Sequence, residues 1–505
     1  MLKLIDSWLN SITMYRVVLY GLVGIAGLAM VLGIAGLLPF SGFRLIGSLL
    51  VLSVVGFSAN WILGKLFRVT TNFESAAITS LILFLIVQPA ATVIDAVSLS
   101  LGILIALASK YLLVLDKKHL FNPAAVGAVA LTYVFDYGVT WWVGSVLLLP
   151  ATLVVGFLIV RKIRRTGLFV AFLLSVLTTI LAFGWYQGQV LSELLLEVWT
   201  SWPLLFFGSI MLTEPLTTPP GSVLRVQYAI LVGFLFGLPL RFGAFFMTPE
   251  LALLLGNVFS HVVSPADKLI LQLKKKVQLV PEVWEFVFTP HKMLAFFPGQ
   301  YMEWTMPVSN IDTRGNRRYF TLASAPTEPE LKLGVKVPEQ ASAFKQSLLA
   351  LKPGATIAAH HLAGEFTLPE DTSQKLVFIA GGIGITPFRS MIQYLLDTKQ
   401  KRDIILFYVC STDSEFAYTD IFNKAAKQLG IQVEYVITKA KNAPKNWQGQ
   451  VGYIDETMIQ SVVPHFAERY FYLSGPHGMV TAYEQVLAEL KIPSNQIKTD
   501  YFPGF

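Results

Sequence analysis

The uneven distribution of charge divides this chain into two halves. Residues 1 to 265 carry 14 lysines and arginines and 9 acidic residues, whereas charged side chains recur every few positions from Asp267 onward. Hydrophobic residues make up 54% of the 505-residue chain, and charged residues make up 14%. Because this composition is too apolar for an ordinary soluble protein, it predicts that the first half lies in a lipid bilayer.

Apolar runs in the first half are long enough to cross a bilayer of about 30 Å, which takes roughly 17 to 25 helical residues. They indicate a polytopic α-helical membrane domain over residues 1–266, with about ten segments. The segments are expected at about 17–38, 45–64, 75–92, 96–115, 120–135, 142–160, 168–185, 199–213, 226–243 and 249–264.

Basic residues indicate the topology, because Lys and Arg accumulate in cytoplasmic loops. With a cytoplasmic N-terminus, the basic run at 161–165 lies inside, whereas Arg44 and Arg241 lie outside. An even number of segments then returns the second half to the cytoplasm. We therefore expect an integral protein of a bacterial inner or plasma membrane. Nucleic acid is not an expected partner, since no basic patch with interleaved aromatic residues stands out.

Two stretches interrupt the apolar pattern at membrane depth. One is Phe-Asn-Pro-Ala-Ala at 121–125, and the other contains Thr213, Glu214 and Pro215. Broken backbone hydrogen bonding in a membrane is tolerated where protein or a cavity satisfies the freed groups. We therefore predict a membrane site at Asn122, Pro123, Thr213 and Glu214, with a simple helix kink as the alternative.

At these residues the chain resembles the flavin-carrying membrane proteins of two respiratory complexes, the Rnf electron-transport complex and the sodium-translocating NADH:quinone oxidoreductase. The resemblance covers roughly residues 40 to 265 and implies a flavin, FMN, in the membrane domain. Glu214 stands where those proteins have Asp. Their loop with a covalently bound flavin has no clear counterpart here. Trp141 and Trp142, which follow the Asn-Pro segment, are expected to be anchors at the membrane interface.

The second half changes to short alternating strands, such as 271–274 and 284–288, which predict a small antiparallel barrel over residues 267–372. After Lys375 a continuous apolar strand runs into Gly381-Gly382-Ile383-Gly384 and an amphipathic helix. A glycine-rich turn between a strand and a helix lets the backbone approach a pyrophosphate. Residues 373–505 are therefore expected to form an α/β Rossmann-like nicotinamide domain.

This half resembles the ferredoxin–NADP reductase superfamily, in the segments Phe297 to Tyr301, Arg318 to Ser324 and Ser474 to Pro476. The resemblance implies that Arg318 holds the FAD pyrophosphate, that Phe320 lies at the isoalloxazine or ribityl group, and that Thr321 bonds near flavin N5. The remaining residues expected to bind FAD are Ser324, Lys336 and Ser342.

The same resemblance assigns the nicotinamide site. Gly381, Gly382, Gly384 and Thr386 are expected to form the dinucleotide phosphate turn, and Ser474, Gly475 and Pro476 to lie beside the nicotinamide. Thr321, Ser474 and the terminal aromatic Phe505 are the expected catalytic residues. Phe505 is expected to cover the flavin, with packing on the surface as the alternative.

Acidic residues after the strand that ends near Ser411 favour NADH over NADPH, because Asp413 and Glu415 repel a 2′-phosphate. One cysteine, Cys410, rules out a thiolate-held iron–sulfur cluster in this chain. Haem and other metal sites are not expected, since His119 and His261 are the first half's two histidines and both lie near predicted helix ends.

The two resemblances together imply a membrane flavin oxidoreductase. Hydride passes from NADH or NADPH to FAD, and electrons pass to a membrane flavin and then to quinone, another acceptor or a redox partner protein. Glu214 is alternatively a proton or cation site. Ion translocation is a further possibility. The rival hypothesis is a transporter or ion-conducting membrane domain that the reductase regulates.

Overall fold

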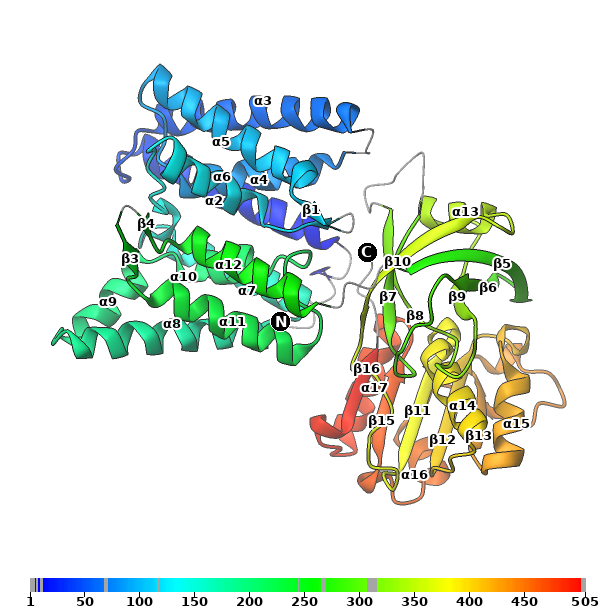
Figure 1. Ribbon diagram of the computed structural model, residues 1–505. Helices are drawn as coiled ribbons and strands as arrows, with labels where there is room; N and C mark the ends of the chain where they lie inside the picture. The colour runs from blue at the N-terminus through cyan, green and yellow to red at the C-terminus, as the bar shows by residue number, and fades with distance from the viewer. Residues whose placement is uncertain are drawn as a thin grey trace. The chain divides into compact units, whose positions relative to one another are not determined.

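The computed structural model describes residues 5, 8–9, 12–67, 71–115, 118–243, 245–264, 269–306 and 316–500. The chain divides into two compact units, with the division between Ala266 and Asp267 (Figure 1). The first unit is helical, and the second contains two six-stranded sheets. Each unit has hydrophobic clusters of its own.

The helical unit contains both long and short helices. They are α2 (Met14–Ile34), α3 (Gly42–Leu66), α4 (Phe73–Ile86), α5 (Val93–Leu112), α6 (Pro123–Val134), α7 (Leu149–Ile163), α8 (Thr166–Tyr186), α9 (Leu191–Ser201), α10 (Leu204–Phe206), α11 (Ser222–Gly237) and α12 (Pro249–Val263). A π-helical turn, η2 (Phe207–Met211), continues α10.

Four of the described helices, α2, α3, α5 and α8, are long and apolar enough to cross a membrane. A fifth span results if α9 and the segment Leu204–Met211, which meet at 61°, count as one. Every predicted segment overlaps a helix. The expected number of about ten spans is nevertheless larger than length and composition support, because several apolar runs form helices of only 12 to 16 residues.

The Asn-Pro pair begins a helix instead of kinking one. Asn122 is the N-cap of α6, and its Oδ1 accepts a hydrogen bond from the Ala125 backbone N–H at 3.1 Å. Pro123 occupies the first turn, where a missing N–H costs no hydrogen bond. This cap shortens the predicted segment 120–135 to the helix Pro123–Val134.

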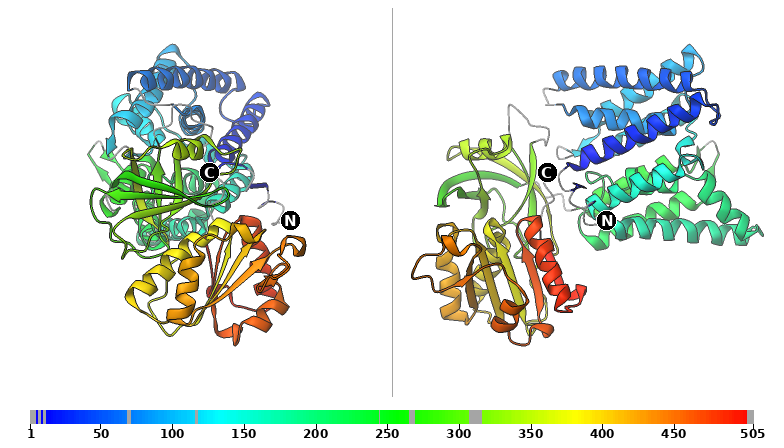
Figure 2. Two further views of the ribbon diagram at one scale, coloured as in Figure 1. Left: turned by 90° about the vertical axis from the view of Figure 1, so that its right-hand side faces the viewer. Right: turned by 180° about the vertical axis from the view of Figure 1, so that it is seen from behind.

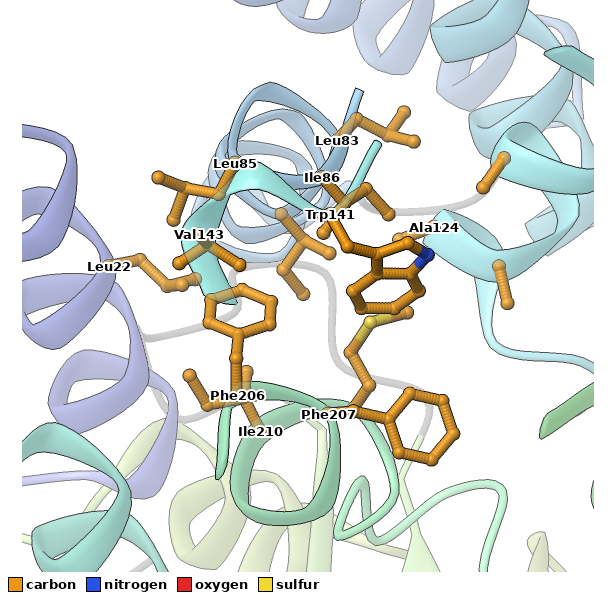
Figure 3. Close-up of a cluster of buried hydrophobic side chains, with 14 of the residues drawn as sticks. Leu22, Leu83, Leu85, Ile86, Ala124, Trp141, Val143, Phe206, Phe207 and Ile210 are labelled. Carbon is orange, nitrogen blue, oxygen red and sulfur yellow. The ribbon is translucent and has the colours of Figure 1, made fainter. Parts of the chain in front are cut away.

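Trp141 and Trp142 are buried in the helical unit, so the expectation that they anchor at an interface is wrong. The Trp142 indole N–H donates to backbone oxygens of α4 and of the residue that follows it. Trp141 packs against Phe207 with ring centroids 5.8 Å apart. Figure 3 shows Trp141 in one apolar cluster with Phe206 and Phe207, so Trp141 packs against the α10–η2 segment in the interior of the helical unit.

The second unit begins with an antiparallel sheet in the order β8-β7-β10-β5-β6-β9. Its strands are β5 (Leu269–Val280), β6 (Val283–Pro290), β7 (Tyr301–Thr305), β8 (Arg317–Thr321), β9 (Leu331–Lys336) and β10 (Thr356–Ala363). Helix α13 (Ala343–Ala350) packs against this sheet through the buried Phe344 and Leu348.

The second sheet is parallel throughout, in the order β14-β13-β12-β11-β15-β16. Its strands are β11 (Leu376–Gly381), β12 (Ile404–Cys410), β13 (Gln432–Ile437), β14 (Gln450–Val451), β15 (Tyr470–Ser474) and β16 (Ile497–Asp500). Four helices accompany them: α14 (Thr386–Thr398), α15 (Thr419–Leu429), α16 (Glu456–Val462) and α17 (His477–Glu489).

Alternate residues of β11 face opposite sides of the parallel sheet. Phe378 and Ala380 pack with α14 and α15, while Val377 and Ile379 pack with α16 and α17. The ribbon views show helices on both faces of this sheet (Figure 2). Strand β11 pairs with β12 on one side and with β15 on the other. The strand order therefore reverses at β11, and in such sheets ligands bind at the carboxyl ends of the strands beside this point.

Candidate functional site

Two glycine-containing turns face each other at the carboxyl ends of β11 and β15. Ala380 and Ser474 are register partners, so the turn that begins at Gly381 lies beside Gly475. A Cβ at Gly384 would collide with the Ser474 carbonyl oxygen and lie 2.6 Å from the Gly475 Cα. Only glycine permits this close approach of the two turns.

Thr386 closes the first of these turns. Its hydroxyl donates to the Ile383 carbonyl oxygen at 3.2 Å, and Pro387 follows in the first turn of α14. Gly382 has a φ of +51°, in the left-handed region. The turn therefore runs directly into a helix N-terminus, an arrangement whose amide groups suit a phosphate.

Thr321, Ser474 and Asp500 come together from three strands. The Thr321 hydroxyl lies 3.4 Å from Asp500 Oδ2, and Asp500 is the register partner of Ser474. Burial raises the pKa of the Asp500 carboxyl to about 7, against which the hydrogen bond from Thr321 acts. Two of the three predicted catalytic residues are thus linked through an acid that the motifs did not identify. Phe505 lies outside the described residues.

Arg318 and Phe320 lie on one face of β8, where both meet Phe344 of α13. The Arg318 guanidinium is 5.5 Å from the Phe344 ring centroid, and the Phe320 and Phe344 rings are 5.7 Å apart. Arg318 is buried and donates to the Arg317 carbonyl oxygen at 2.6 Å. A fixed guanidinium beside aromatic rings is suited to hold a diphosphate attached to a flat ring system.

Two weaker predictions lie near the same helix. Ser342 is the N-cap of α13, and its side chain makes no capping hydrogen bond. Lys345 of α13 donates to the Lys336 carbonyl oxygen at 2.9 Å, while the Lys336 ammonium pairs with Glu282 at 3.3 Å. Arg318 and Phe320 thus contact the first turn of α13, which Ser342 caps, and these residues fit the diphosphate end of FAD, whereas the Lys336 ammonium is directed to Glu282.

Ser324 has a structural position. It is fully buried, its hydroxyl accepts from the Lys332 backbone N–H at 3.1 Å, and its carbonyl accepts from Ser390 of α14 at 2.6 Å. Arg389, next to it, donates to the Ala323 carbonyl oxygen and forms two hydrogen bonds with Glu328. Ser324 thus holds the antiparallel sheet against α14.

The helical unit contains a cavity of about 620 Å³ of empty space, counted with its opening to solvent. All four residues of the predicted membrane site line it: Asn122, Pro123, Thr213 and Glu214. The Asn122 side-chain amide donates to Glu214 Oε2 at 2.8 Å, and Thr217 donates to the same oxygen at 3.3 Å. The two broken segments, far apart in sequence, therefore meet.

Further polar residues contact the side chains and backbone that line this cavity, or line it themselves. His119 Nε2 lies 3.4 Å from Glu214 Oε1, and Arg165 donates to the Thr213 carbonyl oxygen at 3.3 Å. Lys110 of α5 also lines the cavity, together with Ser75 of α4. The motifs did not identify Lys110, but a lysine within an apolar helix is a signal for a functional position.

Comparison with known proteins gives a family match within the second half. Residues 378–485 match the oxidoreductase NAD-binding domain family. A flavohemoprotein of Halalkalibacterium halodurans is 26% identical over 243 residues, which cover 46% of this chain and 58% of the relative. A glycine betaine monooxygenase reductase subunit of Pseudomonas aeruginosa is 24% identical over 221 residues, covering 43% and 60%.

The xylene/toluene monooxygenase electron transfer component of Pseudomonas putida is 26% identical over 256 residues, covering 50% of this chain and 70% of the relative. Among solved structures, the flavohemoglobin from Malassezia yamatoensis has a TM-score of 0.43 at 21% identity, covering 60% of this chain and 74% of that one. The chain spans 58% and 60% of the length of the first two relatives.

Proposed function

We propose that this chain, whose second half is an NAD(P)H-dependent, FAD-binding oxidoreductase module of the ferredoxin–NADP reductase type, transfers hydride from NADH to FAD and passes the electrons to its helical half. The helical half spans a bacterial inner or plasma membrane, with the reductase module in the cytoplasm. The helical half would hold a flavin, FMN, which would supply electron transfer to quinone, to another acceptor or to a partner protein.

The observation that supports the reductase reaction best is the meeting of Thr321, Ser474 and Asp500 beside the two glycine turns. FAD, when bound, accepts the hydride pair and releases electrons one at a time. Arg318 and the first turn of α13 would hold its diphosphate, Phe320 would lie at its ring system, and Ser342 would contribute a weaker polar contact. Ser474 and Gly475 position the nicotinamide ring.

Asp500 is a titratable group at the proposed reaction centre, and its ionisation state affects hydride transfer. Its carboxyl lies against Thr321, and burial raises its pKa to about 7, so the neutral form is favoured below that pH. An ionised carboxylate at this place opposes the arrival of a hydride, while a neutral one does not. Thr321 orients this carboxyl and remains in position to contact the flavin.

NADH is the preferred donor in this proposal. Glu415 accepts hydrogen bonds from the Ser411 backbone N–H at 3.4 Å and from the Thr412 hydroxyl at 3.3 Å, so its carboxylate stays at the end of β12. Asp413, next to it, is exposed. Two carboxylates at this strand end repel the 2′-phosphate of NADPH.

The cavity of the helical half supports a second redox group. It joins Asn122 and Glu214, the two positions that carry the resemblance to the membrane flavoproteins of the Rnf complex and of the sodium-translocating oxidoreductase. Its mostly apolar walls suit a flat ring system.

A transporter or ion-conducting domain is the second candidate for the helical half. The 61° bend between α9 and Leu204–Met211 favours it, as do the buried Thr213 and the half-buried Glu214 that follow this segment. Broken helices that present polar groups at membrane depth are typical of such proteins. In this alternative Glu214 binds a proton or a cation and has no flavin beside it.

The two candidates differ in the acceptors that the purified full chain reduces. With NADH as donor, the electron relay predicts reduction of both ferricyanide and a short-chain quinone. Reduction of ferricyanide without reduction of quinone contradicts a path through the helical half. Failure of both reactions contradicts the reductase itself.

A further inference from the structure

Lys110 places a positive charge in the wall of the helical cavity. It lies near the end of α5, and its ammonium donates to the hydroxyls of Ser75 and Thr79 of α4 at 3.0 and 2.9 Å, and to the Ser75 carbonyl oxygen at 3.2 Å. All three acceptors are neutral. They fix the ammonium in place and use its three N–H groups, but they do not neutralise its charge.

Within the described residues, no carboxylate forms an ion pair with Lys110 at 4.0 Å or less. Glu214 lines the same cavity, but its close contacts are Asn122, Thr217 and His119. The two opposite charges therefore face a common space without pairing. In a poorly polarisable environment such separation is costly, and a ligand that complements both charges offsets the cost.

The two charges define the chemistry of that ligand. Lys110 favours an edge rich in acceptor oxygens and nitrogens that becomes more negative on reduction, and Glu214 favours an N–H donor close to it. The pyrimidine-type edge of a flavin has both features, whereas the carbonyls of a quinone are acceptors only and would face Glu214 without a donor. The apolar wall around them, including Ile78, Ile82 and Ile210, suits the ring system.

We propose that Lys110 is the residue that selects for a flavin in this cavity and stabilises its reduced form through a fixed positive charge. This inference rests on the proposed membrane flavin and adds the residue that sets its affinity and its reduction potential. A positive charge beside the ring strengthens binding of the reduced, more negative form over the oxidised form, so it raises the potential.

The test compares the full chain with Lys110→Met and Lys110→Arg, purified in detergent with added FMN. Bound FMN per FAD and the reduction potential of the bound FMN are measured. FAD content normalises the amount of protein, and elution as a single peak from a size-exclusion column in detergent reports folding of the helical half. We expect the amount of FMN bound to K110M to fall by about tenfold, or the reduction potential of its bound FMN to be lower than in the wild type. K110R is expected to resemble the wild type.

Lys162→Met is the matched control. Lys162 is also a buried lysine of the helical unit, but it does not line the cavity. We expect K162M to leave FMN content and potential unchanged. If K110M does not fold, Thr79→Val removes the acceptor at 2.9 Å and is expected to lower FMN retention by a smaller factor.

The outcomes separate this inference from the proposal on which it rests. Wild-type FMN content and potential in K110M, or in T79V where K110M does not fold, overturn the role of Lys110 and leave the membrane flavin standing. A loss as large in K162M as in K110M also overturns it, because any buried lysine then matters equally. A wild-type chain that binds FAD but no FMN overturns the membrane flavin itself.

Discussion

The candidate site of the reductase half is formed by backbone turns, whereas the candidate site of the helical half is formed by side chains. In the reductase half, backbone turns at strand ends form the site, and glycines at 381, 382, 384 and 475 permit it. In the helical half, side chains from distant helices meet around a cavity: Ser75, Lys110, Asn122 and Glu214. The first site is local in sequence, and the second exists only after folding.

This difference indicates how each half responds to substitution. At Gly384 a single added methyl group disrupts the backbone site, because the colliding atoms belong to the main chain and have nowhere to move. A side-chain site fails when a charge or a hydrogen-bonding group is removed. The following substitutions test whether the two halves behave in these two ways.

The largest effect is expected for Gly384→Ala. The new Cβ would collide with the Ser474 carbonyl oxygen and lie 2.6 Å from the Gly475 Cα, so the two turns must separate. We expect NADH:ferricyanide activity to fall at least about 100-fold, as misplaced reacting groups commonly cost this much. Gly478→Ala, whose Cβ meets no described atom within 4 Å, is the control and is expected to retain activity.

Arg389→Met is expected to have the next largest effect, on stability. The buried Arg389 guanidinium bonds Glu328 and the Ala323 carbonyl oxygen, so its loss leaves a half-buried carboxylate without its main partner. We expect a loss of about 3 kcal/mol, measured as a lower temperature of FAD release. Restoration of stability by a second change, Glu328→Gln, tests the cause. An unchanged release temperature in R389M contradicts it.

Glu214→Gln is expected to lower electron transfer through the helical half and to leave the reductase half unchanged. The amide keeps the size of the side chain but removes the charge that Asn122 and His119 contact. We expect quinone reduction to fall about tenfold while ferricyanide reduction stays at the wild-type level. Equal losses with both acceptors would show that the variant damages the reductase half as well.

Asp500→Asn is expected to change the pH profile. The folded-state pKa of about 7 exceeds the ordinary value of 3.8, so the folded protein holds a proton that the unfolded chain has released between about pH 4 and pH 7. The contribution of the Asp500 carboxyl to the free energy of unfolding is fully present below about pH 4 and is lost as the pH rises through about 7.

The same titration is expected in the reductase rate. NADH:ferricyanide activity should decline above pH 7 in the wild type, and D500N should remove that inflection and run about threefold faster at pH 9. The measurement is kcat/KM for NADH from pH 5 to 9. A wild-type inflection that persists in D500N would assign the titration to another group.

The smallest effect is expected in the choice of nicotinamide. Asp413→Ser removes an exposed carboxylate beside the contacts of Glu415 at the end of β12. We expect the preference for NADH over NADPH to fall about threefold to fivefold, measured as the ratio of kcat/KM values. Comparable kcat/KM for both cofactors in the wild type would contradict the preference altogether.

The same contrast explains what the sequence could predict. The strand, glycine turn and helix around Gly381 and Thr386 are continuous in the chain, so their arrangement follows from local rules. Asp500 was missed because its partner Thr321 lies 179 residues away and no motif contains it. An acid at the carboxyl end of a strand in a doubly wound sheet is the signal that was available.

The helical half was harder to predict because apolar length alone does not define a span. The run around Phe121 forms a helix of 12 residues, since the Asn122 cap and Pro123 set its start. Trp141 was assigned to an interface, but its indole N–H donates to the buried Glu250 at 3.1 Å. The hydrogen bonds of Lys110 to Ser75 and Thr79 depend on how α5 packs against α4, which no local pattern in the sequence indicates.

An anaerobic titration of the purified full chain with NADH tests the central claim most directly. If electrons pass from FAD to a second flavin in the helical half, complete bleaching of flavin absorbance takes about two equivalents of NADH per FAD, since each flavin accepts one electron pair. Complete bleaching at about one equivalent, with FAD as the sole flavin released on denaturation, would contradict the relay.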